Sequence, residues 1–131
     1  MRDLVSVLLP YKDVDATLEE AIASLLSERD ARLELLAIDD GSRDASAAIA
    51  RRLANRDQRV RLLASEGRGL VAALELGRRE AQGAWIARMD GDDVAMPGRL
   101  QFQLSFMKER PEVVALGTRV EAFPSEAVGE G

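Results

Sequence analysis

The sequence predicts an α/β domain built on a mostly parallel sheet with helices on both faces. Short apolar runs rich in Val, Leu and Ile alternate along the chain with segments whose apolar residues recur at helical spacing. The runs are followed by turns that contain Pro, Asp or Gly. Strands and helices that alternate in this way form right-handed crossovers in a single sheet. The length of 131 residues fits one such domain.

Each strand and helix can be placed from local patterns. Buried strands are predicted from the apolar runs at residues 4–9, 33–38, 60–64, 84–89 and 113–116. The first helix is expected to begin at Thr17, which together with Glu20 matches a capping box. Ser42 or Asp44 is expected to cap the second helix, and the third lies between the third and fourth strands. Pro97 is expected to open the fourth helix, whose inward residues are Leu100, Leu104 and Met107.

The domain is expected to cover residues 1–122. Residues 123–131 carry Pro, Ser, Glu and Gly without apolar periodicity, and they are predicted to be a flexible C-terminal tail or a cut end. The first apolar run is too short for a signal-peptide core or a membrane span. We therefore expect a cytoplasmic protein, with membrane association only in a longer native chain.

Composition excludes several kinds of chemistry. Hydrophobic residues make up 47% and charged residues 31% of the chain, as in ordinary globular proteins. The net charge of -5 gives no basic field for nucleic acid, which we exclude as a partner. Because Cys and His are both absent, disulfides, thiolate metal sites and a histidine base are excluded. Any catalysis must depend on carboxylates, arginines or hydroxyls.

Polar clusters follow three of the predicted strands, at residues 10–13, 39–42 and 90–93. Ligands of parallel α/β sheets bind beyond the carboxyl ends of the strands, so these clusters are expected to share one edge. Asp90, Asp92 and Asp93 offer the oxygen ligands that Mg²⁺ or Mn²⁺ prefers. An isolated Asp-x-Asp is more often a solvated turn, but the acids Asp39 and Asp40 at the same edge favour a bound metal or ligand.

A series of short motifs resembles glycosyltransferase family 2. The motifs are Pro10-Tyr11, Asp39-Asp40-Gly41-Ser42, Gly67-Arg68-Gly69-Leu70, Ile86-Ala87-Arg88-Met89-Asp90-Gly91-Asp92-Asp93 and Met96-Pro97-Gly98-Arg99-Leu100. Each motif alone is weak, but their order and spacing over residues 5–120 are specific. The resemblance implies a Rossmann-like GT-A fold that binds a nucleotide-diphosphate sugar with divalent Mn or Mg.

The resemblance also implies roles for individual residues. Asp40 accepts a hydrogen bond from the nucleotide base, and Pro10 and Tyr11 line the base and the ribose. Arg68 approaches the base or the diphosphate. Asp90 and Asp92 are the carboxylates of the Asp-x-Asp motif, which bind the ribose and the metal. Asp93 has a secondary role in this site.

The reaction implied is transfer of a hexose from a UDP-sugar to a hydroxyl of a carbohydrate or lipid-linked acceptor, as in polysaccharide or cell-envelope biosynthesis. Inversion at the sugar carbon needs a general base within reach of the acceptor hydroxyl. In the family this base comes from the segment after the part that matches here. We therefore expect a truncated chain that carries mainly the donor-binding half, and its catalytic residue is unknown.

Other functions remain as alternatives. An incomplete fragment could bind nucleotide sugar without transfer, or form a homo-oligomer through an apolar face and sheet edge that the missing segment would cover. A nucleotidyltransferase or a dehydrogenase is disfavoured because the first predicted strand is not followed by a glycine-rich loop. A response-regulator receiver fits poorly because the third predicted strand ends in Leu62-Leu63-Ala64 rather than in acids.

Three large side chains near the motifs have simpler interpretations than ligand binding. Arg88 is expected to form a structural ion pair with a nearby acid. Arg99 is as easily a surface helix residue as a ligand contact. Trp85 belongs to a buried-strand pattern, so we expect it to pack in the core rather than stack on a sugar.

Overall fold

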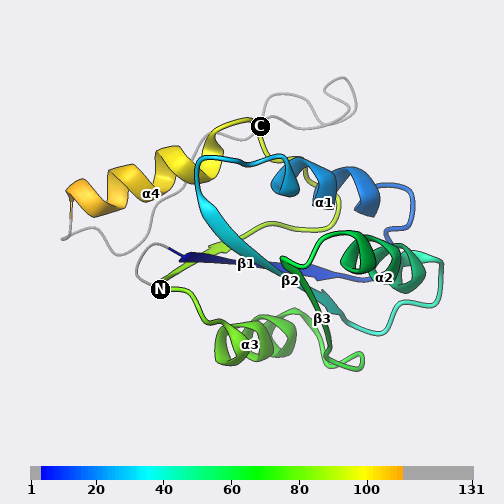
Figure 1. Ribbon diagram of the computed structural model, residues 1–131. Helices are drawn as coiled ribbons and strands as arrows, with labels where there is room; N and C mark the ends of the chain where they lie inside the picture. The colour runs from blue at the N-terminus through cyan, green and yellow to red at the C-terminus, as the bar shows by residue number, and fades with distance from the viewer. Residues whose placement is uncertain (1–3, 111–131) are drawn as a thin grey trace, which may run out of the picture.

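The computed structural model describes residues 4–110, which form a parallel sheet of strands in the order β3-β2-β1-β4 (Figure 1). The strands are β1 (Leu4–Tyr11), β2 (Arg32–Asp39), β3 (Val60–Ala64) and β4 (Trp85–Arg88). The helices are α1 (Leu18–Leu26), α2 (Ser46–Arg56), α3 (Leu70–Glu80) and α4 (Arg99–Glu109). The predicted fold class is confirmed. The fifth strand predicted at 113–116 and the tail at 123–131 lie outside the described residues.

The helices cover both faces of the sheet, as the sequence predicts. Val7 and Leu9 of β1 point to the face where α1, α2 and α4 pack, and they belong to the larger core cluster. Leu8 of β1 points to the opposite face and packs with Ala73 of α3. Helix α3 lies on the other side of the sheet from α1 and α4 (Figure 1). Because β1 and β2 are covered on both faces, they are buried along nearly their whole length, and most of their side chains are apolar.

Helix α4 is the least enclosed of the four. Leu100 and Leu104 are buried as predicted, whereas Met107 is half-buried beside β4. Trp85 packs against the larger core cluster, which confirms its predicted role in packing. Within residues 4–110 no helix has the length and the apolar content needed to span a membrane.

A buried carboxylate fastens the segment after α3 to the sheet. Glu34 of β2 accepts hydrogen bonds from the Ser6 hydroxyl at 2.6 Å, from the Gln82 amide at 2.7 Å and from Arg61 at 3.1 Å. The Ser6 hydroxyl in turn accepts a bond from the Gly83 amide at 2.8 Å. Burial raises the pKa of Glu34, but these donors outweigh burial and hold the pKa below its ordinary value.

The predicted capping box at the start of α1 is wrong. Thr17 precedes the helix, but its side chain makes no capping hydrogen bond. The Thr17 hydroxyl instead donates to the carbonyl of Gly91, 74 positions along the chain, at 3.0 Å. The N-cap of α2 is Ala45, so neither residue considered for this position occupies it. The Asp44 carboxylate nevertheless accepts from the amide of Ser46, the first residue of the helix, at 2.8 Å.

Candidate functional site

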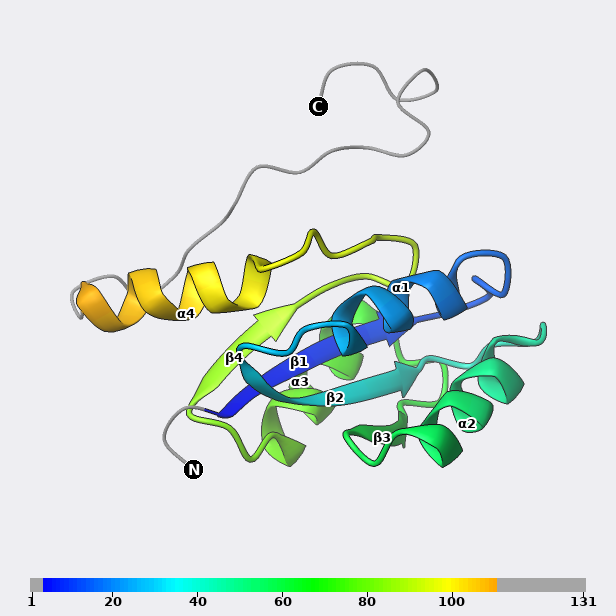
Figure 2. The same cartoon turned by 45° about the horizontal axis from the view of Figure 1, so that its top comes forward.

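The loops that follow β1, β2 and β4 lie along one edge of the sheet (Figure 2). Main-chain hydrogen bonds join them at the ends of the strands. The Asp40 amide donates to the Tyr11 carbonyl at 3.0 Å, and the Met89 amide donates to the Leu8 carbonyl at 3.0 Å. The edge predicted to hold the polar clusters is therefore built as expected, with β1 at its centre.

The loop after β4 brings three carboxylates together. Asp90, Asp92 and Asp93 each offer one carboxylate oxygen, and these oxygens lie within 4.8 Å of one another. Asp90 is half-buried, and the other two are exposed. Burial raises the pKa of Asp93, and the neighbouring charges of Asp92 and Asp90 raise it further. An oxygen-only set of this size fits a hard divalent cation that keeps further positions for phosphate oxygens and water.

Arg88, the last residue of β4, pairs with one of these acids. Its guanidinium lies 3.2 Å from the Asp90 carboxylate, and both side chains are 46% exposed. This confirms the predicted ion pair of Arg88. Because the pair is exposed, its contribution to stability is small, and Asp90 keeps its second oxygen for other contacts.

Asp40 is not part of the three-carboxylate cluster, and hydrogen-bond donors of the protein bind its side chain. Its side chain accepts hydrogen bonds from the Ser65 hydroxyl at 2.8 Å and from the Gly69 amide at 3.0 Å. Asp39 likewise accepts from the Ser42 amide at 2.8 Å. Donors of the protein therefore stabilise both acids, and the expectation that Asp39 and Asp40 favour a bound metal or ligand stays a prediction. A carboxylate oxygen has two lone pairs, so the predicted contact between Asp40 and a base remains a prediction.

Pro10 and Tyr11 at the end of β1 are both buried. Tyr11 is 5% exposed and belongs to the larger core cluster. Its pKa is raised by burial and by the nearby carboxylate of Asp39, so the phenol stays neutral. The side chain packs in the core, and its predicted contact with base and ribose remains a prediction.

Arg68 is the exposed cation of the predicted set. It lies in the turn between β3 and α3, and its guanidinium is 3.6 Å from the carboxylate of Glu66. Both side chains are largely in solvent, so this pair leaves the arginine free to rotate towards an anion. The turn itself is placed by Asp40, which binds the amide of Gly69.

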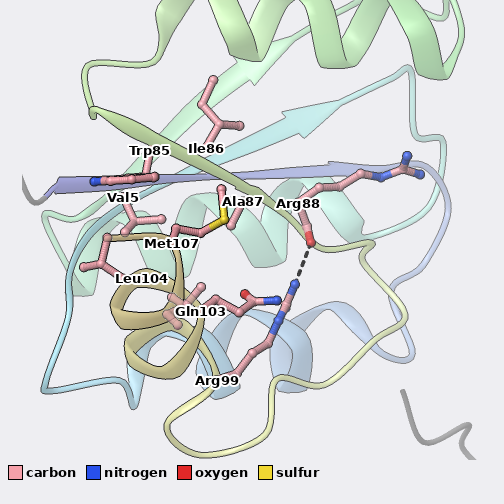
Figure 3. Close-up of a pocket in the computed structure, with 10 residues that line it drawn as sticks. Val5, Trp85, Ile86, Ala87, Arg88, Arg99, Gln103, Leu104 and Met107 are labelled. Carbon is pink, nitrogen blue, oxygen red and sulfur yellow. Dashed lines mark hydrogen bonds between the residues drawn. The ribbon is translucent and has the colours of Figure 1, made fainter. Parts of the chain in front are cut away.

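Arg99 is a site residue whose role the sequence left undecided. Figure 3 shows its guanidinium reaching from the start of α4 to the backbone of Arg88, where it donates to the carbonyl at 3.0 Å. The two arginines line one end of a cavity of about 340 Å³ between β4 and α4, with apolar walls that include Trp85 and Leu104 (Figure 3). Burial lowers the pKa of Arg99, against the opposing charge of Asp93.

The structure thus places an acidic loop beyond the carboxyl end of β4, which is the outer strand of the described parallel sheet, and ligands of such sheets bind beyond the carboxyl ends of the strands. The chain belongs to glycosyltransferase family 2, because the sequence model of Glycosyl transferase family 2 matches residues 6–129. This confirms the resemblance carried by the ordered motifs.

Individual relatives agree with this assignment. Glycosyltransferase EpsE of Bacillus subtilis is 34% identical over 91% of this chain and 44% of its own length. WfgD of Escherichia coli, named as a UDP-Glc:alpha-D-GlcNAc-diphosphoundecaprenol beta-1,3-glucosyltransferase, is 33% identical over 79% of this chain and 41% of its own length. The chain therefore spans less than half the length of these relatives.

Solved structures show the same fold. S. aureus TarS 1-349 in complex with UDP superposes with a TM-score of 0.73 at 20% identity, covering 95% of this chain and 40% of TarS. The mannosyltransferase PcManGT of Pyrobaculum calidifontis, in complex with GDP-Man and Mn2+, gives 0.74 at 24% identity, covering 82% of this chain and 33% of PcManGT. These likenesses confirm the GT-A fold.

Proposed function

We propose that this chain is the donor-binding part of an inverting glycosyltransferase that uses a UDP-sugar and Mn²⁺ or Mg²⁺. The proposed acceptor is a hydroxyl of a carbohydrate or a lipid-linked saccharide. The observation that carries the proposal is the cluster of Asp90, Asp92 and Asp93 at the carboxyl end of β4. Asp90 and Asp92 are the proposed metal ligands, and Asp90 also contacts the ribose.

The names of relatives support the chemical class of the ligand. WfgD is named for UDP-Glc and a diphosphoundecaprenol-linked acceptor, TarS was solved with UDP, and PcManGT with GDP-Man and Mn2+. We favour uridine because WfgD, a relative in sequence at 33% identity, is named for a uridine donor. A hexose is favoured on the same ground.

Different residues of the chain are proposed to bind different parts of the nucleotide-sugar donor. A nucleoside diphosphate leaves slowly until its developing negative charge is neutralised, and a bound divalent cation supplies that neutralisation. Asp40 is proposed to accept a hydrogen bond from the base with a lone pair that Ser65 and Gly69 leave unused. Arg68 is proposed to turn from Glu66 towards the diphosphate.

Calorimetric titration of UDP, with and without Mn²⁺, tests the proposal on the wild-type chain and on Asp92→Asn. The substitution removes one charge and one metal ligand while keeping the size of the side chain. We expect Mn²⁺-dependent binding that weakens in the variant on the order of 100-fold, since even outer-shell losses cost about 10- to 100-fold.

Asp30→Asn is the matched control for this titration. Asp30 is an exposed acid just before β2 that lies near residues 95–100 but outside the three-carboxylate cluster, so the variant changes the charge equally without removing a proposed metal ligand. The control is expected to bind like the wild type. Equal weakening in both variants would mean that net charge rather than a metal ligand governs binding, and absence of binding in the wild type would refute a uridine site.

A second candidate function, self-association, is favoured by the outer edge of β4 and by exposed apolar side chains of β4 and α4, although Ile86 of β4 points away from α4 (Figure 3). Ile86 is 51% and Phe102 is 60% exposed, and β4 pairs only with β1 within residues 4–110. A strand edge without a partner in the described part of the chain is a template for pairing with another chain. Sedimentation velocity over a range of concentrations tests this candidate, and a monomer at all concentrations would exclude it.

A further inference from the structure

Two hydroxyl groups beside α1 hold the loop that carries the three carboxylates. The Thr17 hydroxyl donates to the carbonyl of Gly91 at 3.0 Å, and the Ser24 hydroxyl accepts from the amide of Ala95 at 2.8 Å. The two residues are seven positions apart, which is close to two helical turns, so their side chains project on the same side. Between the two anchored groups lie Asp92 and Asp93.

Each hydroxyl is itself oriented by α1 and its approach. The Ser24 hydroxyl donates to the carbonyl of Ala21 at 2.7 Å, which leaves its lone pairs for the amide of Ala95. The Thr17 hydroxyl lies 3.4 Å from the carbonyl of Val14 and only 3.0 Å from that of Gly91, so its single proton favours the loop.

Close packing fixes Gly91 between the two flanking acids. Gly91 is buried, and a Cβ placed on it would lie 2.9 Å from Tyr11 Cβ and 3.0 Å from a methyl group of Val14. Only glycine lets the loop come this near to the start of the segment between β1 and α1. The Thr17 hydroxyl therefore meets a carbonyl whose position is already restricted.

The two ends of the loop are joined to each other as well. Arg99 donates from its guanidinium to the carbonyl of Arg88 at 3.0 Å, and its amide donates to the carbonyl of Met96 at 3.1 Å. A further bond, from the Asp93 amide to the Asp90 carbonyl at 3.1 Å, closes the turn that bears the acids. The loop is thus held at its ends, and the two hydroxyls hold its middle.

Three carboxylates within 4.8 Å repel one another and would separate if the loop were free to move. We propose that Thr17 and Ser24 are positioning residues, which keep Asp90, Asp92 and Asp93 together as a divalent-cation site before the cation binds. The inference rests on the proposed function, because it assigns these hydroxyls to the same metal site. It accounts for the direction of the Thr17 hydroxyl, away from its own helix.

The experiment compares Thr17→Val and Ser24→Ala with the wild-type chain by titrating Mn²⁺ in the presence of UDP and following free Mn²⁺ by electron paramagnetic resonance. Each substitution removes a hydroxyl with little change in volume. We expect Mn²⁺ to bind about tenfold more weakly in each variant, the lower end of the effect of outer-shell partners. Thr17→Ser keeps the hydroxyl and is expected to restore wild-type affinity.

Ser27→Ala is the matched control, because Ser27 is an exposed serine at the end of the same helix whose hydroxyl donates to the Ser24 carbonyl. It should bind Mn²⁺ like the wild type. A purely structural role predicts lower melting temperatures with unchanged Mn²⁺ affinity. If the variants melt at lower temperature but bind Mn²⁺ as tightly as the wild type, the positioning role is wrong, while the proposed function still stands.

Amide hydrogen exchange without metal separates this inference from the proposed function. The amides of Asp93 and Ala95 are expected to exchange about tenfold faster in the Thr17 and Ser24 variants than in the wild type or Ser27→Ala. If the wild type binds no Mn²⁺, the proposed function fails, and exchange alone then decides whether the hydroxyls order the loop. Unchanged exchange at both amides overturns the inference whatever the metal result.

Discussion

The turns at the ends of β2 and β4 contain the same residue types, Asp and Gly, but have different environments. Asp39-Asp40-Gly41 and Asp90-Gly91-Asp92 both place acids and a glycine at the carboxyl end of a strand. The acids after β2 accept hydrogen bonds from Ser42, Ser65 and Gly69. Those after β4 face one another, and Arg88 pairs with only one of them.

This contrast indicates that an acidic turn at a strand end is a candidate metal site only where its carboxylate oxygens are not already bound by donors of the protein. The turn after β2 lies against the turn before α3, whose amide and hydroxyl donors reach it. The loop after β4 is held through its main chain, at Gly91 and Ala95, so its carboxylates remain available. The two turns should therefore respond differently to cations, to substitution and to pH.

The largest expected effect is stabilisation by Mn²⁺. A ligand that binds only the folded chain adds about 2.7 kcal/mol to the free energy of unfolding at 100 times its dissociation constant. We expect this gain in urea titrations of the wild type and of Asp40→Asn, but not of Asp92→Asn. If only Asp40→Asn lost this stabilisation, the cation would bind at the turn after β2 and the predicted site after β4 would be wrong.

Removal of the Asp40 carboxylate is expected to destabilise the metal-free chain. Asp40→Ala leaves the buried Ser65 hydroxyl and the Gly69 amide without their partner, which costs about 2 kcal/mol. Asp92→Ala is expected to cost almost nothing, since it also relieves repulsion between carboxylates. Urea denaturation of the two variants checks the contrast, and equal losses would contradict it.

The two glycines are expected to resist substitution for different reasons. Gly91→Ala should cost about 1–2 kcal/mol, because the new methyl group overlaps Tyr11 and Val14. Gly41→Ala should cost about 1 kcal/mol, because Gly41 has a φ of 88°, which disfavours any side chain. Only Gly91→Ala is expected to weaken Mn²⁺ binding, as measured by calorimetry, since only it displaces the loop after β4.

The smallest expected effect is on the pH dependence of stability. The pKa of Asp93 is raised in the folded chain, so its ionised form opposes folding above that pKa. The opposition fades as pH falls through the raised pKa towards the ordinary value of 3.8. Asp93→Asn should therefore stabilise the chain at neutral pH by at most about 0.5 kcal/mol, because solvent screens the exposed carboxylate.

Urea midpoints from pH 4 to pH 7 test this prediction for Asp93. The gain of Asp93→Asn over the wild type should shrink towards the acidic end of the series. A gain that grew as the pH fell would mean that the folded chain lowers the pKa of Asp93.

The sequence predicts much of this fold because apolar periodicity is a local property. The runs that form β1 to β4 and the shared edge beyond them follow from that periodicity and from parallel topology. The role of Thr17 could not be predicted, because Thr17 and Glu20 match a capping box while the actual partner is 74 positions away. The satisfaction of Asp40 by Ser65 is equally a product of tertiary packing.

The buried carboxylate of Glu34 bears on the order of folding. It accepts hydrogen bonds from the Ser6 hydroxyl and the Gln82 amide, and the Ser6 hydroxyl in turn accepts from the amide of Gly83, 77 positions further along the chain. This network fastens β4 beside β1 only after the crossover through α3 is complete. Contacts of such long sequence separation form slowly, because the chain must close a large loop first. We therefore expect β4 to join the sheet last, so that during refolding the ability to bind Mn²⁺ returns after the first three strands have assembled.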